Sequence, residues 1–467
     1  DIHERDLKIL EKHNFKIFKS DPKISLKNSL LNFLNEYDKY DEFYMIHGDT
    51  LYSKIDFKPN LIYCNFTNMQ YKWGLIDQIF DNYDLSFENS IISGYFSFNE
   101  INTLKSALKN SPDFINSLKS YNSKEKLQMC LGNNWLDFGH SNLYYKSKVK
   151  LNVTRYFNST EAKYNYIKKS SIDSKKISNE FNWFLNFPKE ISYLVPSTWD
   201  YRDSDESSSY KIEFIAAPTL QEKWVFGNLP DISYKFIFEQ LFDVLKKFKT
   251  HKIEIDNESF LEMHCEMYLK KTSARLSDFI KSTNFQPEKE VEINGKKYPS
   301  LNKFKDDIFT NLKKIIDSKN KSILNLMHGD LCFSNILVDL RSNTIKLIDP
   351  RGSFGVKNID KLVIYGDQLY DIAKLGHSLI GNYDFIVTGF YSIEYSIKKL
   401  KFNFNLLKNT SDELTDFFYK KLQSQNISKQ FIKASISNLF LSMLPLHEDS
   451  PQRQIAFLLN AYKIYYD

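Results

Sequence analysis

The stretch that decides the fold reads Leu-Met-His-Gly-Asp-Leu-Cys-Phe-Ser-Asn over residues 326–335, and Ile-Lys-Leu-Ile-Asp-Pro-Arg-Gly follows over residues 345–352. Asn335 stands five positions after Asp330, and Asp349 ends an apolar run. A short apolar run that ends in a polar turn is typical of a buried strand. The pattern predicts three oxygen-bearing side chains on two adjacent turns. The alternative is a hairpin with two solvated acids and a turn Asn, and the combination of spacing, order and strand context disfavours it.

This order of side chains suits phosphoryl transfer. In kinases the first Asp takes or orients the proton of the acceptor hydroxyl, the Asn holds one Mg²⁺, and the second Asp holds the metal at the nucleotide phosphates. The loose transition state needs mainly positioning and charge neutralisation. We therefore predict Asp330 as the catalytic residue, Asn335 and Asp349 as Mg²⁺ ligands, and ATP as the phosphate donor.

The His-Gly-Asp form of the first segment, in place of His-Arg-Asp, resembles the aminoglycoside phosphotransferase and choline kinase family. The resemblance implies a bilobal α+β protein-kinase-like domain with a mainly helical C-terminal lobe, and a small-molecule acceptor. Gly-Asp-Gln-Leu-Tyr-Asp-Ile-Ala-Lys-Leu over residues 366–375 resembles the same family. There the second Asp, here Asp371, caps a helix and steadies the catalytic loop.

Composition limits the classes of function that this chain can have. A chain of 467 residues predicts two or three domains. The net charge of +5, from 63 basic and 58 acidic residues, disfavours nucleic-acid binding. The four cysteines are far apart, which argues against a zinc site or a disulfide framework and favours a reducing cytoplasm. No run of 18 apolar residues and no signal-peptide pattern is found, so membrane insertion is not expected.

Short apolar runs alternate with helical spacing in the first third of the chain. Strands are predicted at residues 15–18, 42–46, 61–66 and 91–98, and a helix at residues 24–37. Such alternation predicts an α/β, Rossmann-like domain with a mostly parallel sheet, whose ligand site lies at the carboxyl ends of the strands. Asp49 would lie there.

Asn-Trp-Leu-Asp-Phe-Gly-His over residues 134–140 resembles the Trp-x-Asp-x-Gly segment of sugar-phosphate nucleotidyltransferases, and Gly-Tyr-Phe-Ser-Phe over residues 94–98 resembles their Gly-x-Tyr-x-Phe strand. In that family a strand-end Gly-Asp and the later Asp, here Asp49 and Asp137, hold the catalytic Mg²⁺. The resemblance covers residues 1–153 and implies CTP, UTP or another nucleoside triphosphate as substrate. Two carboxylates on Mg²⁺ would offset charge as a phosphomonoester attacks the α-phosphate.

The Gly-rich loop of that family, with its Arg and the following Pro-Lys, occurs nowhere in this sequence. Because the loop belongs to the first strand and helix, it would lie upstream of Asp1, so the chain is either truncated at its N-terminus or has lost the activity. A degenerate scaffold and a glycosyltransferase of related fold remain as alternatives. His-Gly-Asp over residues 47–49 differs from the usual Asp-x-Asp of the latter.

A strand predicted at residues 148–157 leads into the kinase-like part, which places domains at 1–153, 154–226 and 227–467. In a kinase N-terminal lobe, a strand Lys reaches the nucleotide phosphates and a Glu on the next helix holds it. Lys168 or Lys169 with Glu180 would fill these roles. Successive strand residues point to opposite faces, so only one Lys faces the cleft. We favour Lys168, and a surface Lys near a surface Glu is the alternative.

Two further strands are predicted at residues 193–196 and 210–215, the second of which would lead into the hinge between the lobes. There the carbonyl of Glu213 and the amide of Ile215 would bind the nucleobase edge. No glycine-rich loop precedes Lys168, and residues 158–160 are the candidate turn.

Beyond residue 227 the pattern is mainly helical, with helices predicted at residues 234–248 and 256–269 and an Asn-Gly hairpin at residues 291–298. Helices over residues 385–466 would wall the acceptor pocket. Candidate acceptor contacts, or alternatively capped and solvated residues, are His447, Asp449 and Arg453.

The two resemblances together imply a bifunctional enzyme that phosphorylates a sugar or an amino alcohol and couples the phosphate to an NTP. The product would be an NDP-activated building block for a bacterial capsule polysaccharide. One alternative is a kinase of choline or aminoglycoside type whose N-terminal domain is not catalytic. Another is a pseudoenzyme with binding functions, against which the intact set of Asp330, Asn335 and Asp349 argues. The acceptor, the NTP and the oligomeric state stay open.

Overall fold

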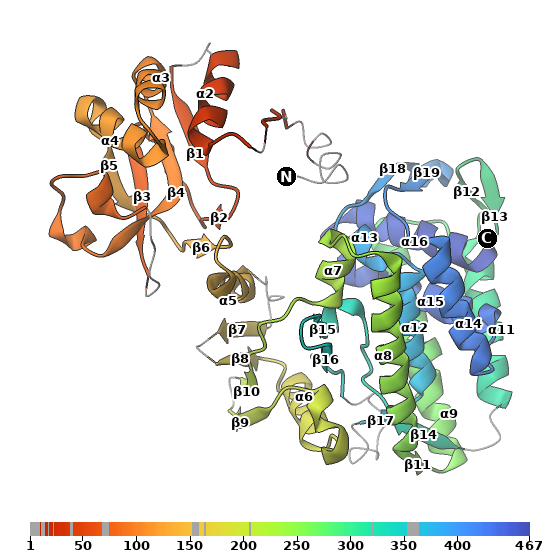
Figure 1. Cartoon of the computed structure of the whole chain (residues 1–467). Helices are drawn as coiled ribbons and strands as arrows, with labels where there is room; N and C mark the ends of the chain where they lie inside the picture. The colour runs from red at the N-terminus through yellow and green to blue at the C-terminus, as the bar shows by residue number, and fades with distance from the viewer. Residues whose placement is uncertain are drawn as a thin grey trace. The chain divides into compact units, whose positions relative to one another are not determined.

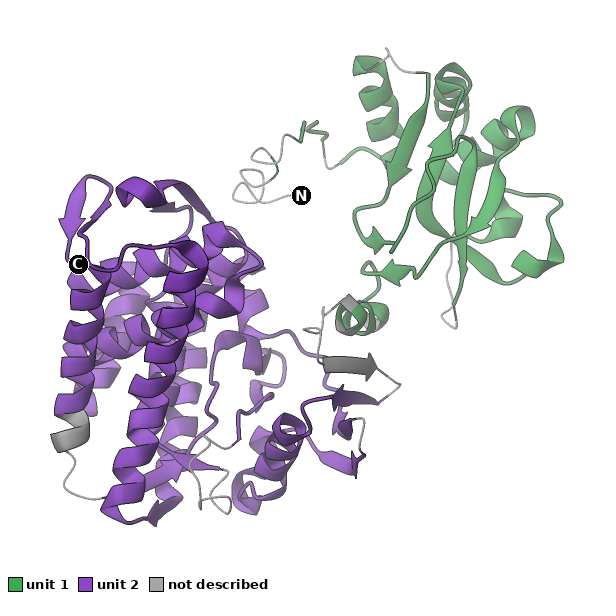
Figure 2. Cartoon of the chain, turned by 180° about the vertical axis from the view of Figure 1, so that it is seen from behind, with its two compact units in different colours: residues 1–153 green, residues 154–467 purple. Residues whose placement is uncertain are grey.

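The computed structural model describes residues 10, 15–16, 18–21, 23–37, 41–67, 74–151, 158–162, 165–204, 207–318, 322–352 and 364–467. The chain divides into two compact units, residues 1–153 and residues 154–467 (Figure 2). Within these described ranges, no helix combines the length and the apolar character that crossing a lipid bilayer requires.

The first unit is a small sheet with helices packed on one of its faces (Figure 1). In chain order its elements are α2 (Leu26–Glu36), β1 (Phe43–Ile46), β2 (Thr50–Leu51), β3 (Leu61–Phe66), η1 (Ile76–Gln78), η2 (Leu85–Phe87), β4 (Ser90–Phe98), α3 (Ile101–Asn110), α4 (Phe114–Glu125), β5 (Gln128–Leu131), β6 (Leu136–Asp137) and α5 (Ser141–Leu151).

The sheet has the strand order β1-β4-β3-β5. β4 runs antiparallel to both β1 and β3, and only β3 and β5 form a parallel pair. The prediction of a mostly parallel sheet is therefore wrong for the strand pairs of the described residues, although β1, β3 and β5 point the same way. The reason is that β4 is buried along its whole length, and a continuous apolar run does not reveal strand direction.

Alternating residues of the strands form two apolar layers. Ile62 and Cys64 of β3 join Phe96 and Phe98 of β4 beneath helices α2, α3 and α4. Their neighbours pack on the opposite face in a cluster of Tyr52, Leu61, Tyr63 and Tyr95. These two buried layers fix the position of the sheet. They thereby also fix the position of the polar turn that follows β1.

Several sequence predictions for this unit need correction. The described positions among residues 15–18 are not in a strand, and β1 is a half-buried edge strand. The strand predicted at residues 148–157 is helical over its first four residues, within α5, and residues 152–157 lie outside the described residues. A helix forms here instead of a strand because it begins at the turn after Gly139 and continues through Leu and Lys, which form helices well.

The second unit begins with a four-stranded antiparallel sheet of order β7-β8-β10-β9, with helix α6 packed against it. The elements are β7 (Asn158–Ala162), β8 (Tyr166–Ser171), α6 (Ser174–Leu185), η3 (Lys189–Leu194), β9 (Thr198–Asp203) and β10 (Ser208–Glu213). The predicted turn at residues 158–160 lies in β7, and the strand predicted at residues 193–196 begins in the 3-10 helix η3. The true partner strand, β9, starts at Thr198.

The rest of the second unit is mainly helical (Figure 1). Its elements are α7 (Leu220–Phe226), α8 (Asp231–Thr250), β11 (Lys252–Glu254), α9 (Asn257–Cys265), the π-helix η4 (Glu266–Lys270), α10 (Lys271–Thr283), β12 (Val291–Ile293), β13 (Lys296–Tyr298), α11 (Leu301–Ser318), β14 (Ile323–Leu326), η5 (Phe333–Asn335), β15 (Ile336–Asp339), β16 (Thr344–Leu347), β17 (Tyr365–Gly366), α12 (Gln368–Leu379), α13 (Tyr383–Val387), β18 (Tyr391–Ser396), η7 (Ile397–Lys399), β19 (Lys401–Leu406), α14 (Asp412–Ser424), α15 (Lys429–Met443), η8 (Leu444–His447) and α16 (Pro451–Tyr466).

The predicted helices at residues 234–248 and 256–269 correspond to α8 and to α9 with η4. The Asn-Gly hairpin is confirmed, with positive φ at Asn294 and Gly295. The all-helical prediction for residues 385–466 is wrong, because β18 and β19 form a hairpin there and β19 pairs with β12. In β19, Phe402 and Phe404 are buried between exposed neighbours, which is the alternation of a half-buried strand.

Candidate functional site

The loop between β14 and η5 brings Asp330 and Asn335 together. The Asn335 side-chain amide donates to the Asp330 backbone carbonyl at 2.8 Å and to its carboxylate at 3.2 Å. The backbone carbonyl of Asn335 accepts a hydrogen bond from the Ile348 amide at 3.0 Å. This last bond places the turn that carries Asp349 directly beside the loop, so the two predicted turns are adjacent.

Asp371, on α12, fixes the start of this loop. Its carboxylate accepts from the His328 amide at 2.6 Å and from the Gly329 amide at 2.8 Å. The prediction that Asp371 steadies the loop fits these contacts. The helix cap is instead Asp367, which accepts from the Leu369 amide and precedes the first turn of α12.

The His328 ring links the two turns. Its Nε2 lies 2.9 Å from the Ile348 carbonyl, and its Nδ1 accepts from the Asp330 amide. Burial lowers the pKa of His328 to about 4. The ring is therefore neutral near pH 7, with the proton on Nε2 to donate to the carbonyl.

The Asp330 carboxylate pairs with the Lys374 ammonium at 2.8 Å. Burial alone would raise the pKa of Asp330, but the charge of Lys374, its hydrogen bond to the carboxylate and the charge of Arg351 lower it to about 2. Asp330 is consequently ionised at neutral pH. Its side chain is 38% exposed while that of Lys374 is 12% exposed, so the carboxylate stays reachable from solution.

Asp349 adopts a left-handed backbone conformation, with φ of +57°. A non-glycine residue in that region is uncommon and often marks a functional position. Its carboxylate forms an ion pair with the Lys169 ammonium, and its side chain is 47% exposed. The turn therefore presents a carboxylate toward the strand β8.

Lys169, not Lys168, is the β8 lysine that faces these groups. Its ammonium contacts both Asp349 and the buried Glu180 of α6, and Glu180 also accepts from the Tyr210 hydroxyl. Burial would lower the pKa of Lys169, but the two carboxylates raise it well above its ordinary value. The preference for Lys168 is corrected because strand alternation sends neighbours to opposite faces, and packing of α6 on the sheet selects the face.

Helix α6 lies against both of these turns. The Trp183 indole N–H donates to the Met327 carbonyl at 2.8 Å. Gly352 has φ of +68°, and a Cβ there would lie 2.6 Å from the Asn179 carbonyl. A side chain at position 352 would thus push against α6, so the glycine allows the Asp349 turn to approach the Glu180 helix.

The predicted hinge lies between β10 and α7. Glu213 ends β10, and its amide donates to the Ser197 carbonyl at 2.8 Å. The Ile215 carbonyl accepts from the Ala217 amide at 2.9 Å in the irregular segment that follows. The segment connects the small sheet to the helical part, as a hinge requires, and nucleobase binding there stays a prediction.

The predicted acceptor contacts separate into two groups. Asp449 and Arg453 form an ion pair with each other, one helical turn apart. His447 is buried, packs against the Phe457 ring, and lies close enough to His377 of α12 to influence its pKa. His447 therefore lies near α12, the helix that supplies Lys374.

The residues present fit the Mg²⁺ that a kinase site implies. Mg²⁺ prefers hard oxygen donors and is usually bound through one or two carboxylates together with substrate phosphates. Asp349 offers a carboxylate and Asn335 an amide oxygen, on turns joined by the bond from Ile348 to Asn335. Groups of three or more His, Cys, Asp or Glu that could bind a metal are not found among the described residues, and this set needs no such group.

The structure also brings the two candidate acids of the first unit together. β2 pairs with β6, with Thr50 opposite Asp137, and the Phe138 amide donates to the Asp49 carbonyl at 2.8 Å. A Cβ at Gly139 would lie 2.3 Å from the Asp49 carboxylate. The Asp137 carboxylate accepts from the Gly139 amide at 2.8 Å and contacts the His140 ring at 2.8 Å.

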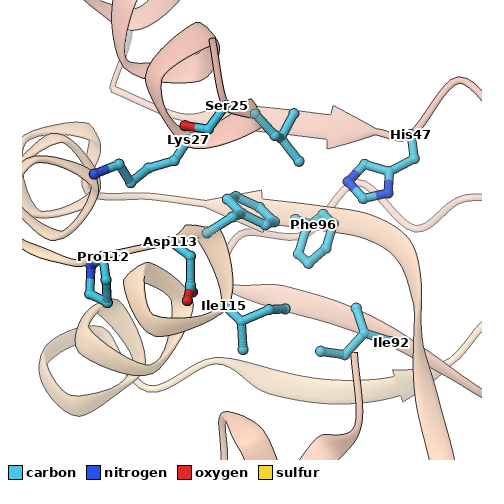
Figure 3. A pocket seen from close by; sticks show the side chains of 10 residues that line it. Ser25, Lys27, His47, Ile92, Phe96, Pro112, Asp113 and Ile115 are labelled. Atoms are coloured by element: carbon cyan, nitrogen blue, oxygen red, sulfur yellow. The ribbon is translucent and has the colours of Figure 1, made fainter. Parts of the chain in front are cut away.

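An apolar cavity of about 370 Å³ lies beside His47, which directly follows β1 (Figure 3). Phe96 and Ile92 of β4 line it together with the first turns of α2 and α4. His47 also lines it, and the Nε2 of His47 is buried without a hydrogen-bond partner among the described residues. Burial lowers the pKa of His47, so the neutral ring packs as part of an apolar wall.

The comparison with protein families marks the second unit as kinase-like. A sequence model of the ecdysteroid kinase-like family matches residues 232–350. The matched segment contains Asp330, Asn335 and Asp349. None of the curated proteins matches this chain.

Three similar solved structures cover between 67% and 69% of this chain. One is the aminoglycoside phosphotransferase APH(4)-Ia in complex with AMP-PNP and hygromycin B, at 12% identity and a TM-score of 0.39, covering 69% of this chain and 97% of that one. The streptomycin–ATP complex of APH(2")-IIa has 14% identity, a TM-score of 0.37, and coverage of 67% and 92%. The aminoglycoside-3'-phosphotransferase of type VIII has 10% identity, a TM-score of 0.32, and coverage of 69% and 100%.

Sequence reasoning missed Lys374 and Tyr210. Lys374 stands three positions after Asp371 on α12, and residues three apart share a helix face. Both side chains reach the same loop, one to its amides and the other to Asp330. That spacing was a usable signal. Tyr210 gave no signal, because its contact with Glu180 joins a strand and a helix 30 positions apart.

Proposed function

We propose that the second unit transfers the γ-phosphoryl group of ATP to a hydroxyl of a small molecule. The observation that carries the proposal is the convergence of Asp330, Asn335 and Asp349 on two adjacent turns, with the Lys169–Glu180 pair against Asp349. Kinases need this combination of groups. The family match over residues 232–350 supports it.

Each residue has a definite part in this reaction. Asp330, ionised and partly exposed, accepts a hydrogen bond from the acceptor hydroxyl and directs its oxygen at the γ-phosphorus. The new O–P bond forms as the bond between the γ-phosphorus and the bridging oxygen breaks, and ADP leaves. The hydroxyl proton passes to Asp330 and then to solvent. Because the transition state is loose, positioning matters more than base strength.

Lys169 binds the nucleotide phosphates, and Glu180 with Tyr210 holds it in place. Its contact with Asp349 keeps the buried ammonium paired until the nucleotide arrives. Asn335 and Asp349 would hold Mg²⁺, which supplies charge neutralisation at the phosphates when bound. Glu213 and Ile215 would bind the nucleobase at the hinge.

The test is acceptor-dependent release of ADP. The full chain is incubated with Mg·ATP and a panel of alcohols, amino alcohols, sugars and hydroxy acids, and ADP is followed by a coupled assay. We expect at least one acceptor to raise ADP release above the background hydrolysis, and Asp330→Asn to remove the increase. A panel without any such acceptor would count against the proposal.

A second activity, nucleotidyl transfer by the first unit, is favoured by one observation. The pairing of β2 with β6 brings the Asp49 carboxylate against Gly139, beside the loop that carries Asp137. We infer a Mg²⁺ site there that joins the phosphorylated product to an NTP, with pyrophosphate as the other product. The chain would then supply an NDP-activated building block for cell-surface polysaccharide. A kinase with a non-catalytic first unit is the alternative.

A further inference from the structure

The Lys374 ammonium reaches the loop that carries Asp330 from a separate helix, α12. It pairs with Oδ1 of the Asp330 carboxylate at 2.8 Å, while the side-chain amide of Asn335 donates to Oδ2 at 3.2 Å. Each oxygen of this carboxylate therefore contacts a positive or partly positive group. The amide belongs to the loop itself, whereas the ammonium is supplied by the tertiary structure.

Contacts on both sides of α12 fix the helix that carries Lys374. Asp371, one turn before Lys374, accepts from the Gly329 amide at 2.8 Å. Because residues three apart share a helix face, both side chains point at the same loop. On the side of α15, a Cβ at Gly376 would lie 2.8 Å from the Ile436 side chain, so the glycine lets the two helices approach closely. The fold therefore sets the position of the ammonium.

The Lys374 ammonium has room for a further ligand. Within the part of the chain that the structure describes, Asp330 is its one ion-pair partner, and the Lys374 side chain is 12% exposed. Since an ammonium has three N–H donors, two of them are open to a ligand or to water. Lys169, by contrast, contacts two carboxylates, those of Glu180 and Asp349. Burial would lower the pKa of Lys374, but the charge of Asp330 raises it above its ordinary value, so the group stays charged at neutral pH.

A cation at this position does not help Asp330 to remove a proton. Burial would raise the pKa of Asp330, but the charge of Lys374 and its hydrogen bond lower it to about 2, and so weak a base takes up a proton poorly at neutral pH. The transferring phosphoryl group is different, because in a loose transition state its three equatorial oxygens carry negative charge that a nearby cation stabilises. The phosphoryl group therefore accounts for this cation better than the proton does.

We propose that Lys374 is a catalytic residue of the phosphoryl transfer, whose ammonium donates to a non-bridging oxygen of the γ-phosphoryl group as this group reaches the acceptor oxygen at Asp330. The inference rests on the proposed function. Lys169 binds the phosphates beside Asp349, and Lys374 binds the transferring group from the side of the acceptor, through a charge-assisted hydrogen bond. Lys374 keeps its proton throughout. The bond to the bridging oxygen breaks, the bond to the acceptor oxygen forms, and the hydroxyl proton passes to Asp330 and then to solvent.

Mg·ADP with tetrafluoroaluminate is a probe that needs no known acceptor. The fluoroaluminate anion mimics the transferring phosphoryl group, and water takes the place of the acceptor hydroxyl. Binding of radiolabelled ADP to the full chain is measured by equilibrium dialysis, with and without aluminium fluoride. We expect the fluoroaluminate to tighten ADP binding at least tenfold in the parent chain, because transition-state analogues bind more tightly than substrates. Lys374→Met should remove most of this gain and leave the binding of Mg·ADP alone unchanged.

Lys421→Met is the matched control, because it also removes the lysine of an ion pair between two helices, here with Glu239 of α8 at 2.5 Å. It should change neither affinity. Thermal melts check that the variants are folded. If Lys374→Met is not folded, Lys374→Gln takes its place. This variant keeps an N–H donor for Asp330 but not the charge, and it should lower the gain from fluoroaluminate in the same direction.

A double-variant cycle separates direct binding from an effect that passes through Asp330. If Lys374 binds the analogue itself, Lys374→Met should still weaken the fluoroaluminate complex at least fivefold in a chain that also carries Asp330→Asn. A lysine that only holds the Asp330 carboxylate in place would have no effect in that chain.

The inference is overturned if the parent chain shows no gain from fluoroaluminate, if Lys374→Met keeps the full gain, or if its effect disappears in the Asp330→Asn chain. Failure of the proposed function is read separately, from acceptor-dependent ADP release with Mg·ATP. A chain that releases ADP with an acceptor but shows no dependence of the gain on Lys374 retains the function and contradicts the inference.

Discussion

The two units each hold a pair of acids at their candidate sites, but they hold them differently. In the second unit, Asp330 and Asp349 each contact an ammonium from a distant element, Lys374 and Lys169. In the first unit, Asp137 contacts the amide of Gly139 and the ring of His140, within its own loop. Counter-charges from distant elements thus position the acids of the second unit. In the first unit, local contacts position Asp137, whereas Asp49 is held through the pairing of β2 with β6.

The largest effect is expected when Asp330 or Asp349 of the second unit is replaced. Asp330→Asn and Asp349→Asn should each lower kcat by about a hundredfold or more, on the order of 3 kcal/mol of transition-state stabilisation. The measurement is steady-state ADP release with the best acceptor. A variant that turns over at the parent rate would remove its residue from the proposed chemistry.

Asp330→Asn also leaves the nearly buried Lys374 ammonium without its carboxylate, which costs stability. The double variant Asp330→Asn with Lys374→Met serves as the control. It should regain thermal stability relative to Asp330→Asn and remain inactive. Recovery of activity together with stability would show that the single substitution acts only through folding.

A second experiment tests whether the two acids of the first unit are catalytic. Asp49→Ala and Asp137→Ala should reduce pyrophosphate release from an NTP and the phosphorylated product by roughly a hundredfold, and leave ADP release unchanged. Gly139→Ala should act in the same direction but more weakly, because its Cβ displaces the Asp49 carboxylate. The readout is pyrophosphate formation with CTP, UTP, ATP and GTP.

For this experiment the parent chain must release pyrophosphate in the first place. Absence of release with every NTP and a panel of phosphomonoesters would favour a non-catalytic first unit. In that case only the second unit would hold a catalytic site.

The third prediction concerns the two adjacent lysines of β8. Lys169→Ala should raise the KM for ATP and lower kcat by roughly thirtyfold, because the ammonium that contacts Glu180 and Asp349 is lost. Lys168→Ala should change either constant by less than roughly threefold, about 0.6 kcal/mol. Equal, small effects of both substitutions would mean that β8 is not the nucleotide-binding strand.

The smallest effect is expected at the contact between α6 and the loop that carries Asp330. Trp183→Phe removes the N–H that binds the Met327 carbonyl and should lower the free energy of unfolding by about 1 to 2 kcal/mol. Trp199→Phe is the control, since that ring is 37% exposed. Chemical denaturation followed by circular dichroism provides the measurement. Equal stability of the two variants would show that the Trp183 bond does not anchor the loop.

The sequence predicted the elements whose patterns are local. The apolar runs of β3 and β4 and the spacing of α2 and α8 predicted these elements nearly at their true bounds. The direction of β4 was not predictable, because a fully buried strand looks the same in parallel and antiparallel sheets. The hairpin of β18 and β19 was overlooked although its alternation was visible, since its surroundings are helical.

The candidate site divides in the same way. The sequence by itself determined the order and spacing of Asp330, Asn335 and Asp349. These residues lie on short turns formed by neighbouring residues, and each chemical role requires a particular residue type. Only the tertiary structure decided that Lys169 faces Asp349, 180 positions away, and that Lys374 of α12 pairs with Asp330. Such contacts depend on which faces of helices and strands pack together, and packing is a property of the whole chain.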